Sequence, residues 1–342
     1  METELILSIC ITSYNRLSEL ERCLNSIDCV QVSEIEIVVS EDHSPLRNEI
    51  KELVDFFSTT SRYKIVFNSN KINQGYDRNL GVLITLSSAK YILFISDDDC
   101  FSKNELSRLI EFLKQNEINA GFLPYYVGTQ TGKLARRYTK GSFRINSDIE
   151  SAEKHIYDSI LFSGLIFKRE KATSYSAERF KNLNYFQVYL FLTILTNFGA
   201  EYIDIPAIVA VSDGENAYGI AESSGGNKLL ADRSSIFSLP EFHKGLIKVL
   251  KIYDEENNSR IIDAFSKEYS LRLYGRLSDS RKISKKNLLA YWKAVKSLEI
   301  KISKISYIYF VVLYVFGSDF SDKMFAIPKA ILTKLRSVES YE

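Results

Sequence analysis

The sequence has almost no excess charge of either sign, since its 342 residues include 44 Lys and Arg against 43 Asp and Glu. Without a net basic field the chain has no general attraction for nucleic acid, so any charge chemistry must be local. Its length allows one large domain with an appendage or two domains. With 45% hydrophobic residues, it can bury a sizeable core.

Cysteine and long apolar runs are also scarce. The longest apolar stretch, residues 308–317, is shorter than the roughly 20 residues that cross a bilayer. Residues 1–4 carry two acids where a signal peptide would be basic. Four cysteines without CxxC spacing predict reduced thiols of a cytosolic protein: Cys10, Cys23, Cys29 and Cys100. We therefore expect a cytoplasmic protein, with peripheral contact to the inner face of the membrane left open.

Strand-like and helix-like segments alternate through the first part of the chain. This alternation predicts a mainly parallel sheet covered by helices on both faces. The predicted strands are residues 5–12, 34–40, 63–69, 91–97, 120–127 and 200–211. The predicted helices are residues 17–27, 48–57, 76–89, 103–116 and 184–199.

The composition changes after residue 211. Residues 212–228 are rich in Gly, Ser and Asn, which is typical of a mobile loop that could close over a ligand, and the chain beyond is helical and polar. We therefore predict one domain over residues 1–228 and a helical C-terminal region over residues 229–342.

The C-terminal region combines an apolar aromatic block with cations. Its basic residues are Lys301, Lys304, Lys323, Lys329, Lys334 and Arg336. Such a segment could rest on an anionic membrane, or it could pack on the first domain or on a second subunit. Membrane contact and homo-oligomer formation both stay open at this point.

Polar clusters follow each of the first four predicted strands: TSYNR, EDHSP, NSNKINQG and SDDD. Ligands of parallel α/β sheets bind outside the carboxyl ends of the strands. The four loops should therefore converge on one edge of the sheet and form a binding site there.

The run Asp97, Asp98 and Asp99 needs an explanation, because adjacent carboxylates repel each other. Mg²⁺ or Mn²⁺ takes carboxylate oxygens and often keeps phosphates as its other ligands, so this run could hold a metal on a diphosphate. Alternatively, it is an acidic turn in which Asp99 or Ser102 caps the next helix.

Two further residues favour the metal. Asp42 could accept hydrogen bonds from a base or ribose, or form an Asx turn before Pro45. Arg78 could offer its donors to phosphate, or form a surface ion pair with Asp77 or a neighbour. No GxxxxGK[ST] or GxGxxG motif occurs, which argues against a kinase-type or dinucleotide site. Together these features describe a nucleotide-diphosphate site.

The stretches LSICITSYNR, IEIVVSEDHS and NQGYDRNLGVLITLSSAKYILFISDDD resemble the start of family 2 of the glycosyltransferases, which have the GT-A fold. The bacterial branch that builds O-antigen and capsular polysaccharide, with abequosyltransferase-like enzymes, is the most similar. The resemblance covers about residues 5–101 strongly and extends to about residue 211. It implies an α/β fold of the GT-A type, with a mixed, mainly parallel sheet flanked by helices.

The resemblance also implies an activity. A family member moves a sugar from a nucleotide-diphosphate donor to a hydroxyl of a glycan or a lipid-linked saccharide, with Mn²⁺ or Mg²⁺ on the diphosphate. UDP is the favoured nucleotide here, and CDP, GDP and dTDP stay open. Two alternatives are a nucleotidyltransferase acting on sugar phosphates and a non-catalytic protein that binds glycans or nucleotides.

Site residues follow from the same resemblance. Ser96 takes the place of the first aspartate of the family's D-x-D motif, and Ser163 and Gly164 match positions that shape its sugar pocket. Alternatively, Gly164 serves close packing only. The nucleotide-sugar ligands would be Thr12, Tyr14, Arg16, Asp42, Gly75, Arg78 and Asp97. The metal ligands would be Asp98 and Asp99.

The catalytic base is the main departure from the family. Many members carry an ED pair about a dozen residues before a glycine, and one of those acids accepts the proton of the acceptor hydroxyl. Counting back from Gly199 gives Gln187 and Val188, neither of which takes a proton at neutral pH. The candidates left are the nearby acids Asp158, Glu170 and Glu178, with Gln187 as a sugar-binding amide. Inversion is the family expectation, but the missing pair leaves inversion and retention both open.

Overall fold

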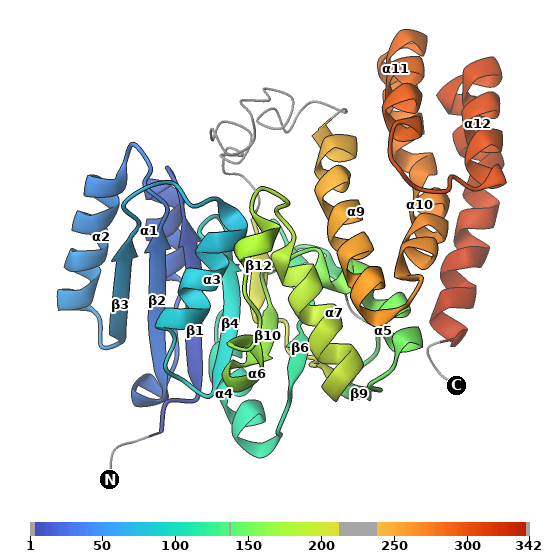
Figure 1. Ribbon diagram of the computed structural model, residues 1–342. Coiled ribbons are helices and arrows are strands. Elements are labelled where there is room, and N and C mark those ends of the chain that lie inside the picture. Colours follow the sequence, from blue (N-terminus) through green and yellow to red (C-terminus); the bar gives the residue numbers. More distant parts are fainter. Residues whose placement is uncertain (1–3, 137, 212–237, 340–342) are drawn as a thin grey trace. The chain divides into compact units, whose positions relative to one another are not determined.

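The computed structural model describes residues 4–136, 138–211 and 238–339, with only the backbone of residues 238, 239, 241 and 326–339. The chain divides into two compact units, residues 1–227 and residues 228–342 (Figure 1). The loop predicted over residues 212–228, and with it the predicted domain boundary, lies outside the described residues.

The first unit is built on a central sheet with the strand order β3-β2-β1-β4-β10-β6-β11-β9. Strands β3, β2, β1 and β4 are parallel neighbours, whereas β10 runs antiparallel between β4 and β6. The mixed, mainly parallel sheet is thus confirmed. The strands are β1 (Leu7–Ser13), β2 (Ile35–Glu41), β3 (Lys64–Ser69), β4 (Tyr91–Ser96), β6 (Ala120–Phe122), β9 (Phe143–Ile145), β10 (Leu165–Lys168) and β11 (Ala200–Tyr202).

Helices cover both faces of this sheet, and β1, β2 and β4 are therefore buried along their whole length. The side chains of Leu7, Ile9 and Ile11 point to the face that packs against α1, α2 and α4, and α3 and α7 lie on the other face (Figure 1). These helices are α1 (Leu17–Asn25), α2 (Arg47–Thr60), α3 (Tyr76–Leu86), α4 (Glu105–Gln115) and α7 (Phe186–Phe198).

Two predicted strands, residues 120–127 and 200–211, are wrong as single strands. Each is divided between the central sheet and a second sheet with the order β5-β12-β7-β8. Pro124 and Pro206 lie at the two breaks, and proline has no N–H to donate within a sheet. The second sheet consists of β5 (Cys100–Phe101), β7 (Tyr125–Val127), β8 (Leu134–Ala135) and β12 (Ile208–Ala210). Since β5 follows Asp99 directly, this sheet holds the chain just past the three aspartates.

Short helices complete the first unit, and the four cysteines are free thiols. The short helices are η1 (Val32–Glu34), α5 (Ile149–His155), η2 (Ile156–Ser159), α6 (Arg169–Ala172) and η3 (Glu178–Phe180). The second unit is helical, as predicted, with α9 (Ser238–Asn257), α10 (Ile261–Ile283), α11 (Lys285–Lys296) and α12 (Lys304–Glu339). No helix in the described ranges is long and apolar enough to cross a membrane.

Helix α7 receives its N-terminal cap from another helix. Its first turn has no acidic residue, and no side chain of its own caps it. Asp77 of α3, which is fully buried, accepts hydrogen bonds from the backbone N–H groups of Leu183, Asn184 and Phe186 at 3.0, 2.8 and 2.9 Å. Burial raises the pKa of Asp77 to about 6, against the opposing effect of these bonds. One carboxylate therefore ties α7 to α3.

Replacing Asp77 with alanine should lower the free energy of unfolding by about 2–4 kcal/mol, because one buried and two part-buried N–H groups lose their acceptor. Urea unfolding followed by circular dichroism measures the change. The matched control is Asp55→Ala, which removes an exposed carboxylate that bonds only to Lys51 within α2 and should change stability by less than about 0.5 kcal/mol. Equal unfolding midpoints for Asp77→Ala and Asp55→Ala would contradict the role given to Asp77.

Candidate functional site

The loops after the first four strands meet at one edge of the central sheet. Thr12 pairs with Ser96 across β1 and β4, Ser13 pairs with Glu41 across β1 and β2, and Glu41 pairs with Ser69 across β2 and β3. All four strands therefore end at the same level, and the convergence predicted from the four polar clusters is confirmed.

A buried guanidinium explains how the aspartates can stand side by side. Arg16 donates from Nη1 to Oδ1 of Asp97 at 2.8 Å and lies 3.3 Å from Oδ2 of Asp98. The backbone N–H of Tyr14 adds a bond of 3.3 Å to Asp97. Burial raises the pKa of Asp97 to about 6, and the charge of Arg16 opposes that rise. Residues predicted to bind the nucleotide sugar are thus brought together with a predicted metal ligand.

The Asp98 carboxylate is positioned by Ser96, the residue that departs from the D-x-D pattern. The Ser96 hydroxyl donates to Oδ1 of Asp98, and the Arg22 guanidinium donates to the Asp98 main-chain oxygen at 3.0 Å. Among the residues that the structure describes, no group of three or more His, Cys, Asp or Glu side chains could hold a metal. Mg²⁺ usually needs only one or two carboxylates when phosphates supply the other ligands, so Asp97 and Asp98 fit such a metal.

Asp99 faces away from this pair. Its Oδ2 accepts a bond of 2.6 Å from the Ser163 hydroxyl, and its Oδ1 accepts a bond of 3.1 Å from the Val211 N–H. The Ser163 oxygen in turn accepts the N–H of Ser96 at 3.0 Å. Burial, together with the charge of Asp98, raises the pKa of Asp99 to about 7. These bonds hold the end of β12 and the segment before β10 against the end of β4.

The alternative prediction for the aspartates, a cap on the next helix, is wrong. The residue at the N-cap of α4 is Asn104, with a φ of 66°. Neither Asp99 nor Ser102 takes that place. The acidic run therefore has no capping role for α4.

Asp42 holds the loop that follows β3. Its carboxylate accepts hydrogen bonds from the N–H groups of Gln74 and Gly75 at 2.7 and 2.9 Å and from the Asn70 amide at 2.9 Å. Burial raises its pKa in spite of these donors. The turn before Pro45 is held instead by Glu41, which accepts from the N–H groups of residues 43 and 44. Asp42 thus positions Gly75, another predicted ligand, whose φ of 79° suits glycine.

Arg78 and Glu178 pair with each other, with 2.6 Å between Nη2 and Oε2. The predicted alternative for Arg78, a surface ion pair with Asp77 or a neighbour, is therefore found with Glu178 as the partner, while Asp77 caps α7. The Glu178 side chain is 70% exposed, and an exposed pair of this kind is worth less than about 1 kcal/mol. The structure therefore places Glu178 beside a predicted phosphate ligand, in a pair that little energy would open.

Arg136 was not singled out from the sequence, although it organises the neighbouring segment. Its guanidinium donates to the main-chain oxygens of Leu123, Asp158, Leu161 and Ser163 at 2.7, 2.7, 3.1 and 3.0 Å. A carbonyl acceptor leaves no mark in a sequence, so no pattern could have identified this role. Arg136 joins the end of β6 to the segment that precedes β10.

Gly164 is required beside this arginine. Its φ is 85°, and a Cβ atom there would lie 3.0 Å from Nη2 of Arg136. Gly164 therefore has a close-packing role, as the alternative predicted. Its part in shaping a sugar pocket stays a prediction.

The segment that Arg136 holds includes Asp158, a candidate for the catalytic base. The same segment accepts a hydrogen bond from Gln187, the candidate for a sugar-binding amide. The buried Asp158 carboxylate accepts the Tyr138 hydroxyl at 2.6 Å and contacts Nδ1 of His155 at 2.8 Å. Gln187 donates to the main-chain oxygen of Ile160 at 3.1 Å, and its own buried side-chain oxygen has no hydrogen-bond partner in the described structure. Asp158 is thus a buried acid with two polar neighbours.

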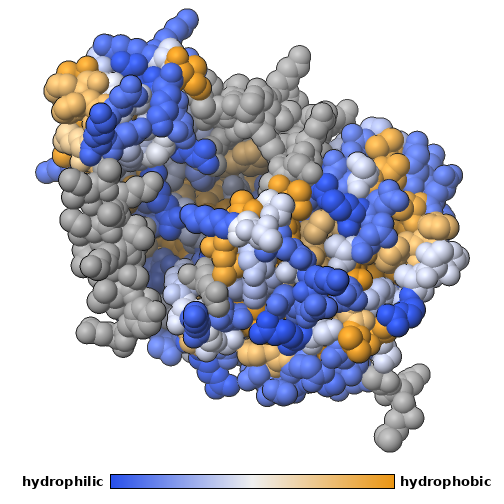
Figure 2. Space-filling view, turned by 180° about the vertical axis from the view of Figure 1, so that it is seen from behind, coloured by the Kyte–Doolittle hydropathy of each residue, from blue (hydrophilic) through white to orange (hydrophobic). Residues whose placement is uncertain are grey.

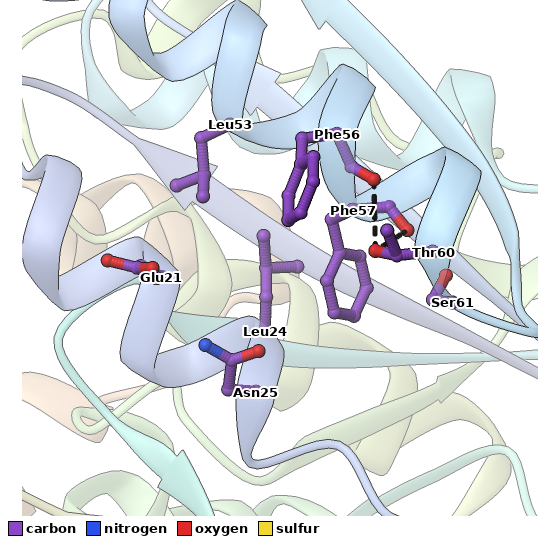
Figure 3. Close-up of a pocket in the computed structure, with 8 residues that line it drawn as sticks. All are labelled: Glu21, Leu24, Asn25, Leu53, Phe56, Phe57, Thr60 and Ser61. Carbon is purple, nitrogen blue, oxygen red and sulfur yellow. Dashed lines mark hydrogen bonds between the residues drawn. The ribbon is translucent and has the colours of Figure 1, made fainter.

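A pocket of about 280 Å³ lies elsewhere, between α1 and α2 (Figure 3). Phe56, Phe57 and Leu24 form its apolar walls, and the Thr60 hydroxyl turns back to main-chain oxygens of its own helix. None of the predicted site residues lines it, so we do not assign the site to this pocket.

Known proteins are similar to this chain in sequence. Residues 8–173 match the family described as Glycosyl transferase family 2. The abequosyltransferase RfbV of Salmonella typhimurium is 28% identical over 109 residues, which are 32% of this chain. The same alignment spans only 33% of that relative, so the match covers about a third of each protein.

Solved structures agree with the fold over most of the chain. The crystal structure of S. aureus TarS 1-349 in complex with UDP-GlcNAc has a TM-score of 0.50 at 15% identity and covers 85% of this chain and 88% of its own. The mannosyltransferase PcManGT from Pyrobaculum calidifontis, in complex with GDP-Man and Mn²⁺, has a TM-score of 0.54 at 12% identity and covers 99% and 86%. The fold is therefore of the GT-A type, and residues 8–173, a little under half of this chain, match glycosyl transferase family 2.

Proposed function

We propose that this protein moves a sugar from a nucleotide-diphosphate donor to a hydroxyl of a cell-surface glycan or of a lipid-linked saccharide at the cytoplasmic face of the membrane. The observation that carries the proposal is the contact of Arg16 with Asp97 and Asp98 at the edge where β1 and β4 end. A buried cation between two carboxylates gives one small region both signs of charge, which suits a diphosphate with its metal.

The donor would lie along the four loops. Arg16 and Arg78 would meet the diphosphate, while Thr12, Tyr14 and Asp42 would contact the nucleoside near Gly75. UDP is the nucleotide that we favour. The complexes of TarS with UDP-GlcNAc and of PcManGT with GDP-Man support a nucleotide-sugar donor in general.

Asp98, with Asp97 beside it, would hold Mn²⁺ or Mg²⁺ on the diphosphate, and Asp99 would keep the segment in place through Ser163. The metal would supply a positive charge that stabilises the leaving nucleoside diphosphate. The Mn²⁺ in the PcManGT complex supports this assignment.

Binding of the donor should depend on metal and on Asp98. Isothermal titration calorimetry with UDP-, CDP-, GDP- and dTDP-sugars should find one donor that binds roughly tenfold more tightly with Mn²⁺ than without. Asp98→Ala should remove that gain, whereas Asp55→Ala, which removes an exposed carboxylate of α2, should keep it.

Binding of no nucleotide, or binding that ignores both metal and Asp98→Ala, would overturn the proposal. Release of pyrophosphate from a nucleoside triphosphate and a sugar phosphate would instead favour a nucleotidyltransferase. Donor binding without transfer to any acceptor would favour the non-catalytic alternative.

We further propose Asp158 as the acid that accepts the proton of the acceptor hydroxyl. It is buried on the segment that Arg136 holds, and the contact with His155 could carry the proton onward. Glu178 is exposed and paired with Arg78, and Gln187 has an amide that does not take a proton.

Asp158→Asn should therefore lower kcat about 10²- to 10⁴-fold, with little change in the KM for the donor. Glu178→Gln serves as the control, and its kcat should stay within about threefold of the wild type, since the side chain is exposed. Steady-state kinetics with a saturating acceptor measures both. A kcat for Asp158→Asn close to that of Glu178→Gln would remove Asp158 from the mechanism.

A further inference from the structure

The first half of α12, before its break at Gly317, is apolar on two opposite sides. Ser306, Tyr309 and Leu313 form one side and are buried against the helical unit. Ile308, Val311 and Val315 are 49, 54 and 60% exposed. Because successive residues of an α-helix turn by about 100°, the second set lies roughly opposite the first. A helix that is apolar all round needs a partner on its second side.

Further large apolar side chains extend this exposed side beyond the break. Figure 2 shows apolar surface next to hydrophilic surface on the helical unit. We define the α12 patch as Tyr307, Ile308, Val311, Val315, Phe316, Phe320 and Met324, all of which are exposed. Elsewhere in the described residues, exposed apolar side chains are scattered, such as Val30 in the loop before η1 and Phe56 on α2. A patch concentrated on one helix marks an interaction surface.

The chain around the patch is basic. Residues 281–324, which include the whole patch, contain nine Lys and Arg against three acids, Glu299, Asp319 and Asp322. Asp322 pairs with Lys282 at 3.2 Å, and the Lys285 ammonium lies 3.8 Å from the ring centre of Tyr314 on α12. The basic residues are Arg281, Lys282, Lys285, Lys286, Lys293, Lys296, Lys301, Lys304 and Lys323. Three other basic residues of the C-terminal region have side chains outside the described structure: Lys329, Lys334 and Arg336.

These charges distinguish between two of the partners that the sequence left open, a membrane and a second subunit. A second copy docked symmetrically on this side would bring two basic surfaces together, which costs free energy. An anionic lipid surface instead attracts them, by about 1 kcal/mol for each Lys or Arg close to it. An apolar helix side with aromatic residues and flanking lysines is typical of a helix that lies in the plane of the bilayer interface.

We propose that the α12 patch binds the surface of an anionic phospholipid bilayer. The apolar side chains of the patch enter the boundary between headgroups and acyl chains, and the basic residues contact the phosphates. This inference does not depend on the glycosyltransferase activity, because binding to lipid needs neither donor nor acceptor.

Co-sedimentation of the full chain with lipid vesicles tests the proposal without any sugar nucleotide. The protein should bind vesicles with about 30% phosphatidylglycerol in phosphatidylcholine, should bind pure phosphatidylcholine far less, and should be released as NaCl rises. Val315→Glu should weaken binding roughly tenfold, because a charge replaces an apolar group in the interface. Val30→Glu is the matched control, since Val30 is 82% exposed on the other unit, and it should bind as the wild type does.

A second variant checks the charge contribution. Lys301→Glu/Lys304→Glu alters exposed side chains only and should also weaken binding, by roughly tenfold or more. Circular dichroism and thermal unfolding confirm that each variant is folded. Absence of vesicle binding by the wild type, or equal binding by Val315→Glu and Val30→Glu, would overturn the proposal. A dimer in light scattering that Val315→Glu alone dissociates would overturn it too and would assign the patch to a second copy.

Discussion

The contact between the Arg16 guanidinium and two buried aspartates is the constraint on which the rest of the first unit depends. A strand that ends in three carboxylates is stable only if a cation or several donors compensate their charge. Arg16 reaches Asp97 and Asp98 because β1 and β4 are neighbours in the sheet. The same adjacency gives the edge both signs of charge, which suits the metal-bound diphosphate that we propose as the ligand.

The surroundings of this contact are held by backbone-directed bonds rather than by further charges. Ser163 links Asp99 to the N–H of Ser96, and Arg136 holds four main-chain oxygens of the adjoining segments. Asp77 fixes the start of α7 in a similar way. In each case one side chain forms hydrogen bonds with backbone groups of segments that are far apart in sequence. These bonds hold segments of the site that have no regular secondary structure.

The helical unit follows a different physical rule. Its helix α12 carries apolar residues on two sides, and among the described residues the unit covers one of these sides. The surrounding cations favour a partner of negative charge over a second copy of the same surface.

The sequence by itself determined the α/β class, the first four strands with their helices, and the meeting of four polar loops at one edge. These features rest on local periodicity and on the rule that parallel strands end together. It could not place the breaks at Pro124 and Pro206, which depend on a change of sheet. Only the tertiary structure decided that Arg16 compensates Asp97 and that Arg136 holds the segment before β10. Those roles arise from contacts between residues distant in the chain, which local patterns do not record.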